Sequence, residues 1–211
     1  MKYKADTFRL YFLIFKLPYS FIMPNAAVHK QMTEDLLLKV SEATSGMVGH
    51  DFILELTQKI PSILGMRYCF VAECSNEEKT RLRTIAFSDG KKLLDNIEYN
   101  TSDSACQKMM DGEPYFLPAG AQKFYKAAKG IEAYVGAPIL SPATGEVLGH
   151  IAVTDPNPVT DEKNHTAVLK IFASRIGAEM ERIKAEKELI NKNEELHRQM
   201  KENEFYAFTI N

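Results

Sequence analysis

Three cysteines carry the most reactive side chains in this chain of 211 residues: Cys69, Cys74 and Cys106. Thiolates act as nucleophiles and as metal ligands, but a metal site needs grouped Cys or Cys/His spacing such as Cys-x-x-Cys. The sequence contains no such pair, and no His lies near any cysteine at ligand spacing. We therefore expect no metal site, and we expect reduced, buried thiols in a cytoplasmic protein.

Other catalytic side chains are not grouped in a way that indicates an enzyme. The sequence shows no nucleophile beside a base and no paired carboxylates in a supporting context. His150 is the only His on an expected strand of the sheet, and without a partner it is expected to be an ordinary strand or core residue rather than a haem ligand. The expected activity is therefore binding, not catalysis.

Composition excludes one large class of partner. Hydrophobic residues make up 45% of the chain, which is enough to bury a core, and the net charge is −2. A nucleic-acid-binding protein normally carries a basic stripe or patch. No partner of that kind is expected.

Residues 1–26 differ from the rest and are predicted to be an aromatic and basic N-terminal extension. Seven aromatic residues lie between Tyr3 and Phe21, but the longest apolar run, 10–15, is far shorter than the ~20 residues of a membrane span. The segment suits a membrane or partner surface, part of a larger fold, or a leader with translation starting at Met23 or Met32. The last two are favoured.

The stretch 131–155 predicts the central β-hairpin of the fold. Two apolar runs flank a turn that contains Pro142 and Gly145. Both faces of the second run are apolar or small, so we expect other elements to pack on each side of the sheet.

Helices and strands that would cover this hairpin can be read on both sides of it. Apolar spacing predicts helices at 27–45 and from an Asp51 cap to Gly65, and strands at 67–73 and 82–87. Residues 91–130 form an irregular insert, with short helices at 101–112, capped by Ser102, and 121–129, and a brief strand at 114–117.

A long helix capped by Thr160 is expected to end the chain. Its core stripe runs from Val168 to Ile183, after which the composition becomes rich in Glu and Lys. Apolar residues continue at seven-residue spacing, as in Leu189 and Leu196, which is typical of a short coiled coil; a solvated tail helix is the alternative. We therefore divide the chain into 1–26, a domain at 27–180, and a helical coiled-coil linker and tail at 181–211.

The hairpin motifs resemble those of the GAF domain family. The run from Tyr134 to Leu140 followed by Gly145 to Val153 is similar to the family's strand pair, with Pro138 and Gly149 at matching places. The segment 160–173 resembles its last helix, and 102–118 resembles the insert that covers its pocket. The likeness covers roughly residues 46–186.

This resemblance implies an α+β, GAF/PAS-like fold. The family has an antiparallel sheet of five to six strands, helices on both sides and a long C-terminal helix. Its members commonly sense small molecules in bacterial signalling proteins, dimerise through terminal helices and act on an output domain or partner protein. A homodimer is thus implied here, and the cofactor or ligand is unknown.

Particular family chemistries find little support in the sequence. Bilin attachment needs a Cys in the region of 126–132, and none is present. The Asp161-Glu162 pair alone is a weak match to cyclic-nucleotide-binding members. Free-methionine sulfoxide reductase, an enzyme of this fold, would use Cys106, but its second insert Cys is absent.

The expected function is therefore a small-molecule-sensing and dimerising module. A structural GAF-like module without ligand, and a reductase-like enzyme using Cys106, remain alternatives. The residues expected to line a ligand pocket come from the insert and the hairpin: Tyr99, Ser102, Ser104, Cys106, Phe116, Tyr125 and Tyr134.

Overall fold

The computed structural model describes residue 38 and residues 46–76, 78–102, 104–125 and 128–209, with side chains up to residue 203. The described residues from 46 to 209 belong to one compact unit. The N-terminal extension and almost all of the helix predicted at 27–45 lie outside the described residues. Among the helices that are described, none is long and apolar enough to cross a membrane.

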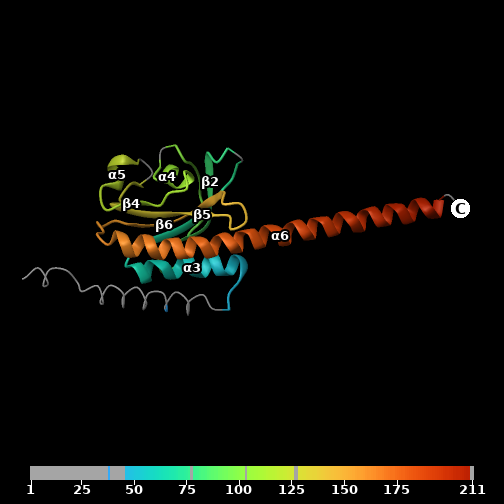
Figure 1. Cartoon of the computed structure of the whole chain (residues 1–211), viewed down its shortest axis with the longest axis horizontal. Coiled ribbons are helices and arrows are strands. Elements are labelled where there is room, and N and C mark those ends of the chain that lie inside the picture. The colour runs from blue at the N-terminus through green and yellow to red at the C-terminus, as the bar shows by residue number, and fades with distance from the viewer. Residues whose placement is uncertain (1–37, 39–45, 77, 103, 126–127, 210–211) are drawn as a thin grey trace, which may run out of the picture. The chain divides into compact units, whose positions relative to one another are not determined.

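A six-stranded antiparallel sheet is the centre of the fold (Figure 1), as predicted. Its strands lie in the order β3-β2-β1-β6-β5-β4. Their bounds are β1 Tyr68–Cys74, β2 Arg81–Ser88, β3 Glu98–Asn100, β4 Tyr115–Leu117, β5 Ala133–Leu140 and β6 Val147–Asp155.

The predicted hairpin is confirmed as the β5–β6 pair. Its turn is closed by a 2.8 Å bond from the Ser141 amide to the Glu146 carbonyl, and Gly145 has a φ of 75°, which only glycine adopts without strain. Along β6, Ile151 and Val153 point to one face, whereas His150 and Ala152 point to the other. All four are fully buried, so both faces of the sheet are covered.

Two helices cover one face: α3, Gly49–Leu64, and α6, Glu162–Thr209 (Figure 1). The predicted cap at Asp51 is wrong because α3 begins two residues earlier, after Val48. The predicted Thr160 cap of α6 is also wrong. The Asp161 carboxylate accepts a 3.2 Å bond from the Asn164 amide, because Asp161 immediately precedes the first helical residue.

Close contact between α6 and the sheet depends on Gly177. A Cβ atom at this position would lie 2.3 Å from the Leu140 carbonyl oxygen at the end of β5. Large side chains fill the rest of this face, among them Phe52, Leu56, Phe172 and Ile176, each at most 1% exposed. The helix-covered face is thus a densely filled apolar core.

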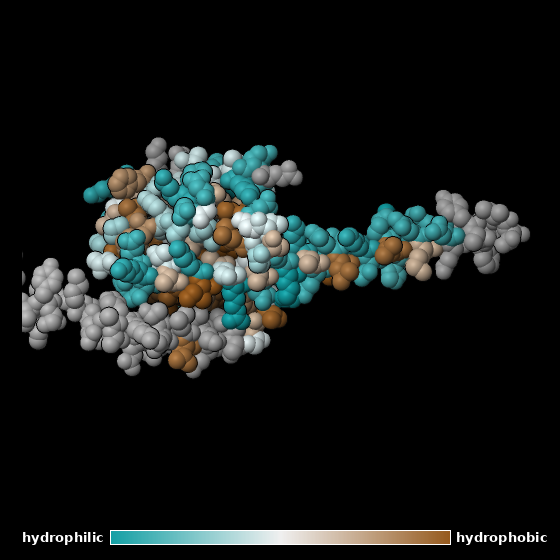
Figure 2. All heavy atoms as spheres, viewed as in Figure 1, coloured by the Kyte–Doolittle hydropathy of each residue, from teal (hydrophilic) through white to brown (hydrophobic). Residues whose placement is uncertain are grey.

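The second half of α6 has no cover within the described chain. Every side chain from Lys184 to Asn203 is exposed. Leu189, Ile190, Leu196 and Met200 remain 55–61% exposed, and Figure 2 shows brown side chains among hydrophilic ones along this part. Leu189, Leu196 and Met200 lie on one side of the helix because they are seven and four residues apart.

The insert covers the opposite face with two short helices, α4 Cys106–Met110 and α5 Ala121–Phe124. These helices are shorter than predicted, and the Ser102 cap is wrong because α4 begins after Ala105. Gly136 on β5 lets α4 approach the sheet, since a Cβ there would lie 2.1 Å from the Met109 sulfur. The predicted strand at 114–117 is confirmed as β4.

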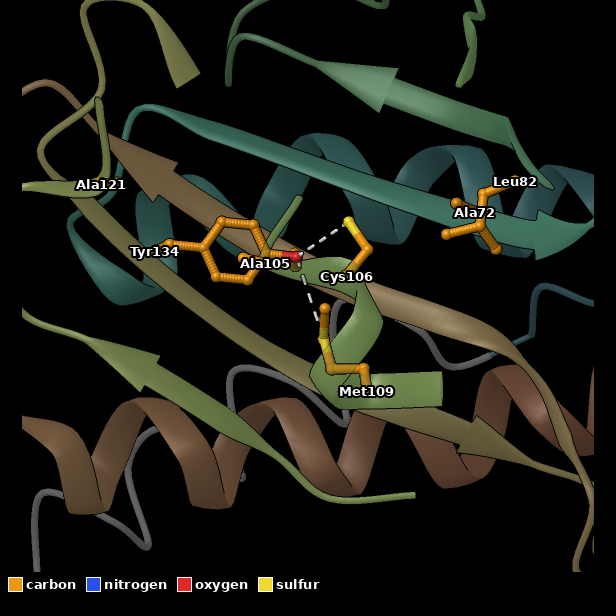
Figure 3. Packing of buried hydrophobic residues seen from close by; sticks show 8 residues of the cluster. Ala72, Leu82, Ala105, Cys106, Met109, Ala121 and Tyr134 are labelled. Atoms are coloured by element: carbon orange, nitrogen blue, oxygen red, sulfur yellow. Dashed lines mark hydrogen bonds between the residues drawn. The ribbon is translucent and has the colours of Figure 1, made fainter. Parts of the chain in front are cut away.

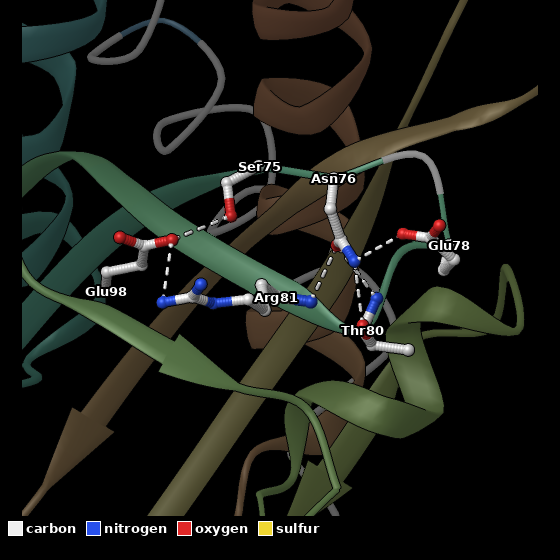
Figure 4. Close-up of polar contacts among 6 residues, drawn as sticks. All are labelled: Ser75, Asn76, Glu78, Thr80, Arg81 and Glu98. Atoms are coloured by element: carbon white, nitrogen blue, oxygen red, sulfur yellow. Dashed lines mark hydrogen bonds and ion pairs between the residues drawn. The ribbon is translucent and has the colours of Figure 1, made fainter.

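Strand β3 was not predicted, and polar contacts fix it at the sheet edge (Figure 4). Arg81 of β2 forms a 3.3 Å ion pair with Glu98 of β3. In the adjoining turn, Asn76 accepts bonds from the amides of Thr80 and Arg81 at 3.1 and 2.9 Å. Antiparallel pairing with β2 places Tyr99, the central residue of β3, beside Leu82.

Candidate functional site

A pocket of about 570 Å³ lies between the sheet and the insert. Its walls come from strands β1, β2, β3, β5 and β6, from the segment that leads into α4, and from the segment after α5. This volume falls within the range of small-molecule sites. The insert therefore encloses space on this face, whereas α3 and α6 fill the other.

Aromatic rings form much of the pocket wall. Phe70 of β1 is the hub: its ring lies 5.9 Å from that of Phe87 and 6.5 Å from that of Tyr134, both edge-on. Tyr68, Tyr99 and Tyr125 complete the aromatic lining. Such a wall favours an apolar or aromatic molecule, because burying its surface releases water from both partners.

A polar cluster around Cys106 interrupts this apolar wall, and Figure 3 shows its contact between Cys106 and Tyr134. The Cys106 sulfur lies 3.5 Å from the Tyr134 hydroxyl and 3.7 Å from the Tyr99 hydroxyl. The Tyr99 hydroxyl in turn lies 3.4 Å from Nε2 of His150. His150 is fully buried, as expected for a core residue, and its Nδ1 atom has no hydrogen-bond partner within the described chain.

The cluster changes the acidity of its members. Burial alone raises the pKa of the Cys106 thiol, but the nearby charge of His150 and hydrogen bonds from its neighbours outweigh burial and lower the pKa to about 6. Burial, together with the Cys106 charge, raises the pKa of Tyr99 and Tyr134. The phenols therefore stay protonated and can donate to a Cys106 thiolate at neutral pH.

Polar atoms elsewhere in the pocket are largely satisfied within the protein. The Thr84 hydroxyl accepts a 2.7 Å bond from the Ile97 amide, and the Tyr125 hydroxyl donates to that of Tyr115 at 3.2 Å. Burial first, and then the Tyr115 contact, raise the pKa of Tyr125 to about 12. Among the described residues that line the pocket, Lys129 is the only lysine, arginine, aspartate or glutamate.

Five of the seven residues predicted from the sequence line this pocket: Tyr99, Ser104, Cys106, Tyr125 and Tyr134. Ser102 lies outside it and is exposed. Phe116 also lies outside it. Phe116 pairs with Val135, whose side chain belongs to the helix-covered face, whereas its neighbours Tyr115 and Leu117 pack on the pocket side.

Sequence reasoning missed the wall contributed by β1 and β2, notably Phe70, Thr84 and Phe87. Period-two alternation places Phe70 on the opposite face from Cys69 and Val71, so it assigns these residues to a face. It does not say which face the insert would cover. That information lies in the packing of 91–130.

The three cysteines occupy different environments and none forms a disulfide. Cys69 is buried on the helix-covered face, and burial raises its pKa. Cys74 is half-buried, its sulfur lies 3.8 Å from that of Met110, and burial also raises its pKa. Within the described residues, no group of three His, Cys, Asp or Glu side chains could hold a metal ion.

The architecture defines the class of protein. An antiparallel six-stranded sheet has helices on one face and, on the other, a short-helix insert enclosing a pocket, and the chain continues into a long helix. The sequence matches the model of the GAF domain over residues 50–180. The chain therefore belongs to the GAF domain family, as its resemblance predicted.

Solved structures agree with this assignment of the fold. The GAF domain of an Acinetobacter phosphoenolpyruvate-protein phosphotransferase is 13% identical, with a TM-score of 0.59 over 79% of this chain and 99% of that one. The A. aeolicus nlh2 GAF domain, in an inactive state, is 17% identical, with a TM-score of 0.57 over 72% and 97%.

A third similar structure is the phycoerythrobilin-bound GAF domain of a cyanobacterial phytochrome. It is 13% identical, with a TM-score of 0.58 over 75% of this chain and 99% of that one. No curated protein matches the sequence. At these identities the likeness establishes the fold, and function has to be argued from the site itself.

Proposed function

We propose that this chain is a small-molecule-sensing and dimerising module of a signalling protein, which binds its ligand in the aromatic pocket and relays the pocket state through α6. The observation that carries the proposal is the partly open pocket of about 570 Å³ with aromatic walls. The ligand is a small organic molecule with a flat or apolar body. The chain acts in the cytoplasm, by binding and not by catalysis.

Strand β5 provides the physical connection for the relay. Tyr134 points into the pocket, whereas Val135 and Ala137 point to the opposite face, which α6 covers. A ligand that shifts Tyr134 also shifts the surface on which α6 packs. Since α6 continues as one helix to Thr209, such a shift reaches the exposed half of the helix and, through it, an output domain or partner protein.

Similar proteins support the signalling role. The GAF domains of a phosphotransferase and of a bilin-bound phytochrome share the fold, as do residues 122 to 287 of a methyl-accepting chemotaxis protein. The alternative, a structural module without ligand, predicts that the pocket serves only as imperfectly packed core.

Ligand binding separates these two readings. We expect the purified chain to retain a small molecule in native mass spectrometry, or to gain thermal stability with members of a panel of small aromatic compounds. Ile97→Trp places a large ring at the pocket wall, where residue 97 is 51% exposed, and should weaken binding about tenfold or more.

Leu93→Trp is the matched control, because Leu93 lies on the same β2–β3 connection, is 39% exposed and does not line the pocket. Binding should be unchanged in this variant. A full panel without any retained or stabilising compound would favour the structural module.

Dimerisation is proposed to use the exposed apolar stripe of α6. We expect Leu189→Glu with Leu196→Glu to weaken the dimer at least tenfold, because two charges would be buried between helices. Light scattering after gel filtration measures this. Asn191→Glu, on the opposite side of the helix, should leave the dimer intact, and a dimer that persists without residues 181–211 would refute the claim.

A further inference from the structure

Cys106 combines three properties that do not occur together at the other two cysteines. Cys106 lines the pocket, and its sulfur contacts the hydroxyls of Tyr99 and Tyr134. The Tyr99 hydroxyl in turn contacts the buried imidazole of His150. Within the described chain, Nδ1 of the buried His150 has no hydrogen-bond partner, which is costly, so an arrangement that merely filled the core would favour an apolar side chain here. The geometry suits a thiol whose proton can leave.

We propose that Cys106 captures small, apolar electrophiles that enter the pocket, forming a thioether by conjugate addition to an α,β-unsaturated carbonyl compound. This inference rests on the proposed ligand pocket and adds a covalent step within it. The occupant is thus a reactive enone or enal, and the bound adduct is the state that the module reports.

A relay through Tyr99 supplies the proton transfer. In the thiol form, Cys106 donates to the Tyr99 oxygen. In the His150 tautomer that carries its proton on Nδ1, the Tyr99 hydroxyl donates to Nε2. Shifting both protons along this chain yields a Cys106 thiolate and a protonated imidazole. The Tyr134 hydroxyl, 3.5 Å from the sulfur, donates to the thiolate as well.

The addition balances without an oxidant or a reductant. The thiolate attacks the β-carbon, a C–S bond forms, and the C=C π electrons move to the carbonyl oxygen as an enolate. The α-carbon then takes back the proton that His150 had accepted. In sum, the S–H bond and the C=C π bond are lost, and the C–S and C–H bonds are gained.

The pocket favours apolar electrophiles over polar ones. Its walls near Cys106 include the rings of Phe70 and Tyr134 and the methyl group of Ala105, and Cys106 itself is only 3% exposed. A reagent must leave water to reach the sulfur, so one with a hydrophobic body is concentrated there. The rate of reaction at Cys106 should therefore depend more strongly on the hydrophobicity of the reagent than the rate of reaction with a free thiol does.

The experiment treats the full-length chain with 2-cyclohexen-1-one between pH 5 and pH 9 and maps adducts by peptide mass spectrometry. We expect the rate of Cys106 labelling to be half-maximal near pH 6. The rate of Cys74 labelling should still be rising at pH 9, because its pKa is raised, although Cys74 is only half-buried and nearer to solvent. Cys106→Ser should remove the low-pH adduct, and Cys74→Ser should leave it. Faster reaction of Cys74 at pH 6.5 would overturn the proposal.

Two variants test the relay separately from folding. His150→Asn should raise the midpoint of Cys106 labelling by about one to three pH units, because the neighbouring positive charge is lost. Tyr99→Phe should slow labelling at least about tenfold at pH 7. Circular dichroism shows which variants fold, and a folded variant of either kind with an unchanged profile contradicts the relay.

A comparison of reagents tests the role of the pocket. For each thiol, we compare the rate of reaction with 2-cyclohexen-1-one to the rate with acrylamide. This ratio of rates should be about tenfold higher at Cys106 than for glutathione, and equal ratios would overturn capture within the pocket. Saturated cyclohexanone distinguishes the two proposals. If it stabilises the chain while the enone forms no Cys106 adduct, the covalent step fails and sensing stands; if neither ligand has an effect, pocket binding of this class fails too.

Discussion

The two faces of the sheet use the same strands for different purposes. On the helix-covered face, Phe172 and Ile176 of α6 fill the space against β5 and β6, and Cys69 is an apolar thiol within that core. On the insert-covered face, the rings leave a pocket, and Cys106 belongs to a polar cluster. Burial raises the pKa of Cys69, whereas His150 and its neighbours lower that of Cys106.

This difference indicates that the helix-covered face contributes most of the packing stability, whereas the insert-covered face holds the reactive side chains. A filled core gains stability from close contacts between its side chains but leaves no space for a ligand. A pocket leaves that space, and its lining side chains lose some of those contacts. Under the proposed function, placing the two on opposite sides of one sheet would let a ligand perturb Tyr134 without opening the helix-covered core. Strand β5 would connect the two faces in such a sensor, because its alternate residues belong to each face.

The largest expected effect comes from breaking the filled face. Phe172→Ala removes a ring that is 1% exposed and should lower the free energy of unfolding by about 3–5 kcal/mol. Phe87→Ala, at a half-buried ring that already lines a pocket, should cost only about 1–2 kcal/mol. Urea denaturation measures both, and equal losses would contradict the difference between the faces.

An intermediate effect is expected at the contact between α6 and β5. Gly177→Ala puts a methyl group within 2.3 Å of the Leu140 carbonyl oxygen, so the helix must move, at a cost of about 1–3 kcal/mol. Ser174→Ala, an exposed position one turn earlier, should change stability by less than about 0.5 kcal/mol. If Gly177→Ala were as neutral, the tight packing of α6 on the sheet would be disproved.

The smallest effect is a pH dependence that only the pocket face should show. The folded pKa of Cys106, about 6, lies below the unfolded value of about 8.5, so between these pH values the unfolded chain binds the extra proton. Its contribution to stability should rise by about 1–2 kcal/mol from pH 6 to pH 8 and be lost as pH falls through 6.

Unfolding of the wild type and of Cys106→Ser at both pH values measures this contribution as a difference. Cys69→Ser is the control on the other face. Because burial raises the pKa of Cys69, this thiol stays protonated throughout the window and should add no slope. If Cys69→Ser changed the pH dependence of the unfolding free energy as much as Cys106→Ser does, the two thiols would not be distinguished by their environments.

Local patterns carried most of the fold. The alternation in 147–155, with the turn at Pro142 and Gly145, was sufficient to predict the β5–β6 hairpin, because a strand's two faces can be read from every second residue. Strand β3 escaped prediction because its three residues are too few for a pattern. It exists through pairing with β2 and the Arg81–Glu98 contact.

The candidate site was predictable only in part for the same reason. Cys106 and Tyr134 could be assigned to the insert and the hairpin from the family resemblance, but Phe70 and Phe87 gave no sign that the insert would leave space above them. Phe116 and Tyr115 are neighbours on β4, and only the register with β5 decides which one faces the pocket side.

By itself, then, the sequence determined the central hairpin and the long helix that leaves it, because these depend on interactions between residues close in the chain. Its resemblance to the GAF domain family implied the class of fold. Tertiary structure alone decided the pocket and the acidity of Cys106. Both depend on side chains from distant segments: Tyr99 and His150, whose contact completes the cluster, are 51 residues apart. Electrostatic shifts follow distance in space, and a linear pattern does not record that distance.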